Sequence, residues 1–177
     1  MSRLEKIGEP EYPLSMSLVL SHLRIEPDAV GEETELLSRY IEAALDYCGG
    51  FTRRQIPLQK FRLTLDSAGS CIELPHPPAA SVESVTDAGG LIDPSMYILR
   101  TDLWPSALEL LTPPSGQVVI EYTAGYTEAT LPSQIRQAAL LIIGQSYDIR
   151  QETVTGTSAT RVPMSAESLL WMQRMGL

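Results

Sequence analysis

The residues KFRLTL at positions 60–65 mark a change in the pattern of the chain. Phe61, Leu63 and Leu65 alternate with polar residues, a period of two that is typical of a strand with one buried face. Five further short apolar runs follow, separated by Pro, Gly and Asp residues that favour turns; they lie at 71–74, 82–86, 96–99, 108–111 and 118–122. No segment between them is long enough for a crossover helix, so the pattern predicts about six short antiparallel strands.

On both sides of these strands, apolar residues recur at spacings of three and four, which is typical of helices packed on one face. About four helices are expected, near residues 15–26, 31–50, 132–150 and 165–175. Gly49 and Gly50 are expected to end the second helix, and the third, which is the most apolar, is expected at the centre of the core. The sequence thus predicts an α+β fold, with an α-helical core (14–50 and 131–177) interrupted by an antiparallel all-β insert (55–126).

Two segments show neither pattern. Residues 1–13 are polar and contain Gly8 and Pro10, so they are expected to form a flexible arm ahead of a single domain over residues 14–177. Residues 151–162, QETVTGTSATRV, are small and polar. They are expected to form a loop that is mobile or becomes ordered on contact with a partner.

Composition and charge limit the possible functions. The 177 residues are 44% hydrophobic and 20% charged, as expected for a globular protein with a substantial core. The net charge of −9 argues against phosphate binding through a broad basic face. No apolar run approaches the roughly 18 residues of a membrane span, and the first residues lack the apolar region of a secretory signal. The protein is therefore expected in a cytoplasm, without a membrane partner.

A search for catalytic and ligand-binding motifs finds none of the phosphate-loop, dinucleotide, serine-hydrolase or zinc-protease patterns. His22 is interpreted as a helix-end residue and His76 as a turn residue. Cys48 and Cys71 are not spaced like zinc ligands or a disulfide framework. The sequence therefore predicts a protein that is not an enzyme, with no catalytic residues, no metal and no cofactor.

Two features are compatible with contact with other protein chains. Residues 1–35 contain three basic and eight acidic side chains, whereas residues 131–177 contain four basic and three acidic ones. This asymmetry fits either a solvated acidic face or charge complementarity between neighbouring subunits. The last helix gathers apolar side chains that either close the core or bind a partner: Leu169, Leu170, Trp171, Met172 and Met175.

The order of several short motifs resembles the head–tail connector (adaptor) family of long-tailed bacteriophages and prophages. The first helix ends with His22-Leu23-Arg24-Ile25 ahead of acidic residues, and the second ends with Tyr47-Cys48-Gly49-Gly50. Further matching stretches follow in family order, namely Arg62–Asp66, Leu74–Pro78, Val82–Val85, Tyr122–Tyr126 and Tyr147–Glu152. The match covers roughly residues 14–176, with Val19-Leu20 standing where members often have Ala-Lys. Residues 1–13 have no counterpart.

The resemblance implies a structural virion protein that assembles as a ring, typically of twelve copies, under the portal. Such a ring extends the DNA channel and provides the platform for tail attachment. The implied partners are further copies of the chain, the portal protein and a tail-side connector or tail completion protein, while DNA passes through without specific binding. The implied location is the virion head–tail junction, after assembly in the host bacterial cytoplasm. By the same resemblance, residues 169–172 and Met175 are expected to dock onto the portal.

A second interpretation is a host-side or prophage-derived binding module that stays monomeric and takes a small-molecule or protein ligand. It predicts a stable monomer with a defined pocket. A DNA-binding accessory protein is disfavoured, because the chain has a net charge of −9 and only two lysines, Lys6 and Lys60.

Overall fold

The computed structural model describes residues 2–26, 31–149 and 164–175, and it confirms the α+β class. The helices are α1 (Met16–Leu23), α2 (Thr34–Thr52), α3 (Ser133–Ile149) and α4 (Met164–Trp171), with 3-10 turns η2 (Gly31–Glu33) and η3 (Pro94–Met96). The strands are β1 (Ser2–Glu11), β2 (Leu58–Leu65), β3 (Cys71–Glu73), β4 (Ala79–Asp87), β5 (Gly90–Leu91), β6 (Tyr97–Arg100), β7 (Ala107–Leu110) and β8 (Val118–Ala124). The predicted loop at 151–162 lies outside the described residues.

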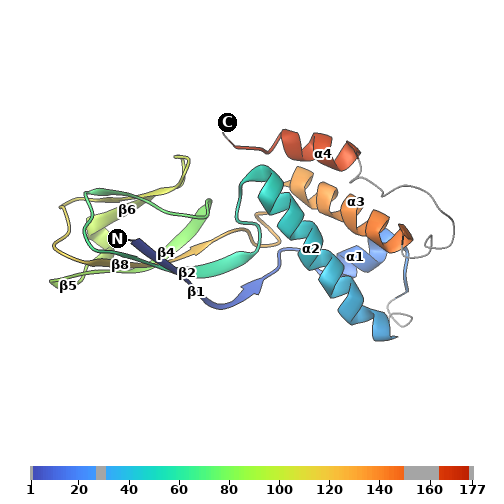
Figure 1. Cartoon of the computed structure of the whole chain (residues 1–177), viewed down its shortest axis with the longest axis horizontal. Helices are drawn as coiled ribbons and strands as arrows, with labels where there is room; N and C mark the ends of the chain where they lie inside the picture. The colour runs from blue at the N-terminus through green and yellow to red at the C-terminus, as the bar shows by residue number, and fades with distance from the viewer. Residues whose placement is uncertain (1, 27–30, 150–163, 176–177) are drawn as a thin grey trace. The chain divides into compact units, whose positions relative to one another are not determined.

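The chain divides into two compact units. The first, here called the β unit, lies within residues 1–11 and 57–126, and the second, the helical unit, lies within 12–56 and 127–177. The β unit contains a five-stranded sheet in the order β1-β2-β8-β4-β5 and a three-stranded sheet in the order β3-β7-β6. Figure 1 labels the five strands of the first sheet and β6 of the second. All strand pairs in both sheets are antiparallel, as the turn-rich spacing predicts.

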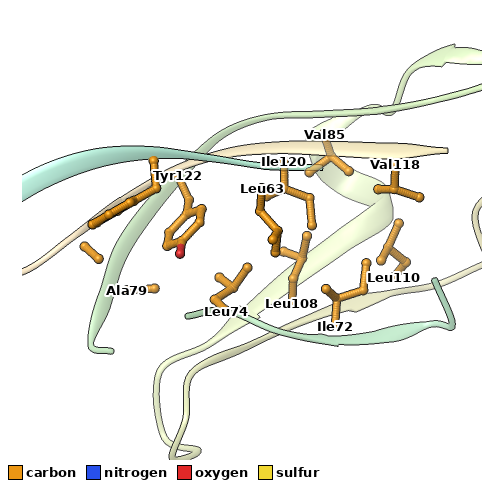
Figure 2. Packing of buried hydrophobic residues seen from close by; sticks show 12 residues of the cluster. Leu63, Ile72, Leu74, Ala79, Val85, Leu108, Leu110, Val118, Ile120 and Tyr122 are labelled. Carbon is orange, nitrogen blue, oxygen red and sulfur yellow. The ribbon is translucent and has the colours of Figure 1, made fainter. Parts of the chain in front are cut away.

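The core of the β unit lies between the inward faces of its two sheets. Every second residue is buried in β8, and Gln59, Phe61 and Leu63 are buried in β2, because alternate side chains of a strand point to opposite faces. Figure 2 shows Leu63, Ile120 and Tyr122 on one side and Leu74 and Leu108 on the other. The whole cluster comprises Phe61, Leu63, Ile72, Leu74, Ala79, Val85, Leu108, Leu110, Val118, Ile120, Tyr122 and Ala124.

The prediction of a flexible arm at residues 1–13 is wrong for residues 2–11. They form β1, which pairs with β2 along the edge of the five-stranded sheet. Leu4 lies opposite Leu63 and packs against the β core, which fixes the register. Pro10 is tolerated because an edge strand has one unpaired side, and the register shifts between Ile7 and Glu11. Of residues 2–11, only Leu4 packs against the β core, so this segment lacks the alternating apolar residues from which a strand could be predicted.

The helical unit is built around α3, as its apolar sequence predicts, with α1, α2 and α4 packed on it. Buried residues of this unit include Val19, Leu37, Ile41, Leu45, Cys48, Ile135, Ala138, Ala139, Ile143 and Leu170. The first helix is confirmed, and it ends where Arg24 adopts a left-handed conformation (φ 58°). No helix in the described part of the chain is long and apolar enough to cross a membrane.

The predicted end of the second helix at Gly49-Gly50 is wrong, since α2 continues to Thr52 and stops at the left-handed Arg53. Gly49 has a different role. A Cβ atom at this position would lie 3.0 Å from the backbone oxygen of Arg54. The glycine therefore lets the chain return closely against the helix after it ends.

Candidate functional site

The last helix separates the five predicted docking residues into two groups. Leu170 is fully buried, so it belongs to the core of its own subunit, where α4 packs on α2 and α3. Trp171 and Met172 point outward, with 56% and 66% of their surface exposed. Leu169 and Met175 are half-buried. Leu170 therefore closes the core, and its neighbours along the chain are the ones available to a partner.

Trp171 is held in place by side chains from α2 and from the segment after α4. Its ring meets the Phe51 ring edge to face, with centroids 5.4 Å apart at an interplanar angle of 86°. The guanidinium of Arg174 lies 4.7 Å from the Trp171 centroid and 5.7 Å from that of Phe51. Edge-to-face and cation–π contacts of this kind orient a partly exposed ring.

Hydrogen bonds to backbone carbonyl groups fix the segment that follows α4. The N–H of Met175 donates to the carbonyl oxygen of Thr52 at 3.3 Å, and the Arg54 Nε–H donates to the carbonyl oxygen of Gln173 at 3.0 Å. These bonds connect residues 173–175 to the C-terminal end of α2. The exposed side chains are thus presented by a segment with a defined conformation, which lowers the entropic cost of docking.

We call Phe51, Leu169, Trp171, Met172 and Arg174 the C-terminal patch. Its charge differs from that of the chain as a whole, which is acidic at −9. Arg53 and Arg54 lie at the adjoining end of α2. The acidic residue of α4, Glu167, accepts a hydrogen bond from the Tyr47 hydroxyl at 3.5 Å, and burial together with Glu167 raises the pKa of Tyr47. The patch therefore combines exposed apolar side chains with the Arg174 guanidinium.

The histidines and cysteines singled out in the sequence are not brought together. His22 is exposed on α1 and faces Gly144 of α3. His76 stacks on Phe61 at 4.9 Å between centroids, and burial, with a contribution from Lys6, lowers its pKa. Within residues 2–26, 31–149 and 164–175, no three His, Cys, Asp or Glu side chains gather as a possible metal site.

The two cysteines differ in their exposure to solvent. Cys48 is inside the helical unit, where desolvation raises the pKa of its thiol to about 12, and Cys71 is exposed on β3. A buried thiol with such a pKa is not a nucleophile at neutral pH.

The polar face of the five-stranded sheet carries an ion-pair ladder that the sequence did not reveal. Arg62 on β2 donates two hydrogen bonds to Glu121 on β8, at 3.0 and 2.6 Å. Lys60 contacts both Glu121 and Glu83 on β4, and these hydrogen bonds lower the pKa values of both carboxyls. The basic side chains of this face are thus neutralised within the chain.

One hollow in the described part of the chain lies beside α1 and is partly open to solvent. Its lining residues are Ser17, Leu20, Ser21, Arg24, Ile25 and Glu26.

Three solved structures are similar to the chain over almost its whole length. A chain from the neck of an empty gene transfer agent (GTA) particle, computed with C6 symmetry, has a TM-score of 0.72 and 26% identity, covering 99% of this chain and 96% of its own. A chain from the virion of the native GTA particle has a TM-score of 0.70 and 25% identity, covering 98% and 96%. A chain from the native GTA neck computed with C12 symmetry has a TM-score of 0.67 and 23% identity, covering 99% and 96%.

No protein-family model matches the chain, and neither does any curated protein. The structural similarity confirms the resemblance to head–tail connectors, because the neighbours come from the neck of a phage-like particle. These neighbours are structural virion proteins, so the prediction of a non-enzymatic protein is also confirmed. The chain is thus similar to structural components of the particle neck.

Proposed function

We propose that this protein is a connector subunit that assembles as a twelve-membered ring beneath the portal of a phage-like particle. The observation that carries the proposal is the similarity of the entire chain, at 26% identity over 99% of its length, to a neck chain. The C6 and C12 symmetries of two neighbouring structures support a ring. In this proposal the β unit and the helical unit both belong to one connector subunit. The ring extends the DNA channel and offers its far side to a tail-side connector or tail completion protein.

The charge of the chain suits a channel through which DNA slides. Twelve copies at −9 each would carry a formal charge of −108 before counterions bind. Such a field repels phosphate groups rather than holding them. The ion-pair ladder supports this role, because Lys60 and Arg62 are already engaged by Glu83 and Glu121. DNA therefore passes without specific binding.

The C-terminal patch, together with Met175, is proposed to dock onto the portal. It presents Trp171 and Met172 on a segment that is already ordered. Tryptophan is among the residues that contribute most to protein interfaces when it occupies a pocket of the partner. Leu170 takes no direct part, because it is buried within its own subunit.

The ring is tested by native mass spectrometry over a concentration series, alone and with the portal protein of the same particle, with negative-stain images of any large species. We expect closed rings of twelve copies, either free or formed on the portal as a template. A chain that stays monomeric at every concentration and also fails to assemble on the portal would refute the connector function. It would support the monomeric binding module instead.

Docking is tested with Trp171→Ala and Met172→Ala, measured against the portal protein by sedimentation. Each variant should bind more than tenfold more weakly while retaining the thermal stability of the original chain. Leu91→Ala is a matched control, because Leu91 is 74% exposed but lies on β5 in the other unit. Equal losses in all three variants would contradict the assignment to the C-terminal patch.

A further inference from the structure

We infer that β6 is the edge at which an extended, basic segment of the tail-side protein (tail-side connector or tail completion protein) adds as a further strand of the three-stranded sheet. The inference rests on the proposed connector function and locates its tail-side contact. In that proposal the portal contacts the helical unit, which leaves the β unit for the tail-side protein. The β6 edge belongs to the β unit and shares no residue with the C-terminal patch.

The first observation is that β6 is an edge strand with one unpaired side. It pairs with β7 in a regular antiparallel register over Tyr97–Arg100, and no other described strand pairs with it. The backbone N–H and C=O groups that point away from β7 therefore have no strand partner within the described residues. Such an edge can bind a further extended chain through main-chain hydrogen bonds.

The second observation is that β6 lacks the features that hinder pairing at the other edges of the two sheets. β1 carries several charged side chains, and its register shifts after Ile7. β4 has two register shifts, and β5, which covers part of its edge, has only two residues. β3 ends with the exposed Glu73. By contrast, β6 begins with the strand-favouring residues Tyr97–Leu99, and its pairing is regular.

The third observation is exposed apolar surface beside this edge. Tyr97, Leu99 and Leu110 pack against the β core, so the residues next to them along the strands point outward. Two of these outward residues, Ile98 and Leu111, are more than half exposed. An added strand would cover Ile98 with an apolar side chain of its own, because side chains on neighbouring strands pack in pairs.

The charge around β6 determines the chemistry of the segment that fits there. Residues 66–118 contain seven acidic side chains and one basic side chain, Arg100. Arg100 is already engaged by Asp102 and Glu109. Hydrogen bonds from Arg100 lower the pKa of Asp102 to about 2, and hydrogen bonds from Ser95 lower the pKa of Asp93, so both carboxyls are charged at neutral pH. An acidic edge of this kind attracts a segment with basic side chains.

The same charge disfavours a second copy of the chain at this edge. The chain has a net charge of −9, and β3, the opposite edge of the same sheet, carries the exposed Glu73. Pairing of β6 with β6 of another copy would be a two-fold contact that stops at two subunits, whereas a ring needs head-to-tail contacts. A basic segment of a different protein therefore fits the edge better than another subunit does.

The test uses the full chain, as a ring or assembled on the portal, with the purified tail-side protein of the same particle as the probe. Ile98→Lys should lower the association constant at least tenfold, because lysine hinders edge pairing and repels a basic segment. Leu91→Lys is the matched control: Leu91 is an exposed apolar residue on β5, an edge strand of the other sheet, and its binding should be unchanged. Binding by the original chain should weaken several-fold as the salt concentration rises.

Hydrogen exchange on the original chain reads out strand addition directly and does not depend on how a variant folds. When the tail-side protein binds, backbone amides within Tyr97–Arg100 should gain protection, because those that point away from β7 acquire hydrogen-bond acceptors. The amides of the edge strand β1 should show no such gain.

Every other result overturns a stated part of the inference. If Ile98→Lys binds like the original chain, or if the β6 amides gain no protection, the tail-side protein contacts another surface, and its binding to the original ring leaves the connector function standing. An equal loss in Leu91→Lys would assign the effect to charge alone. Binding that does not depend on salt would exclude a basic segment. Protection of β6 on ring assembly without the probe would identify a second copy as the occupant. Rings that never bind the tail-side protein would refute the proposed tail attachment itself.

Discussion

Replacing Leu170 with alanine should separate the folding role of α4 from its docking role. Leu170 is fully buried, and Leu→Ala changes at such positions lower the free energy of unfolding by about 2–5 kcal/mol, since both apolar burial and packing are lost. For a chain of this size, a loss of about 3 kcal/mol corresponds to a decrease in melting temperature of roughly 6–12 °C. Met172→Ala is the matched comparison: a side chain of similar size, two residues away and 66% exposed, whose loss should cost less than about 1 kcal/mol.

The assay is urea unfolding followed by far-ultraviolet circular dichroism, which reports mainly on the helical unit. The two variants should have similar slopes against urea and different midpoints. A cost below about 1 kcal/mol for Leu170→Ala, or equal costs for both variants, would show that α4 is not part of the core. The assignment of Leu170 to the fold and of Met172 to the docking surface would then have to be abandoned.

Three further predictions concern other parts of the chain. Burial lowers the pKa of His76 in the folded protein. The unfolded chain therefore binds a proton on His76 at a higher pH than the folded chain, so the stability of the β unit should fall as the pH drops below about 6.5. Urea midpoints at several pH values should show this fall, and it should be absent in His76→Asn. Gly125→Ala should prevent folding of the β unit, as judged by lost hydrogen-exchange protection of its strand amides, because the new Cβ would overlap the Pro57 carbonyl group at a φ of +111°. A thiol reagent at neutral pH should modify Cys71 but not Cys48 in the folded protein, and both in urea; rapid modification of Cys48 without urea would contradict its burial.

The helices and most strands could be predicted from the sequence because each buries one face, and the apolar residues of that face recur at a regular spacing along the chain. The alternation of Phe61, Leu63 and Leu65 is local information, and β2 follows it directly. The pairing of strands is not local. The arrangement of β3 next to β7 brings Cys71 opposite Glu109, and no pattern along the chain specifies that two separate sheets should enclose the core.

The site shows the same division between local and non-local information. Consecutive apolar residues at positions 169–171 lie on different sides of a short helix, so their spacing does not tell which one faces the core. The structure settles this by packing Leu170 inward and leaving Trp171 exposed. Phe51 and Arg174, which hold Trp171 in place, come from segments more than 100 residues apart, and only the fold brings them together.

The small size of the C-terminal patch is compatible with stable docking if the proposed ring is correct. A stable one-to-one protein complex normally buries about 800 Å² on each partner, more than one tryptophan, one methionine and one arginine can provide. In a ring, however, the first subunit to dock places the remaining patches next to equivalent sites on a symmetric partner. Each later contact is then intramolecular, and the combined affinity exceeds that of a single patch by orders of magnitude. The same reasoning explains why a weak patch is useful, since a single subunit in solution would dissociate from the portal whereas a complete ring would stay bound.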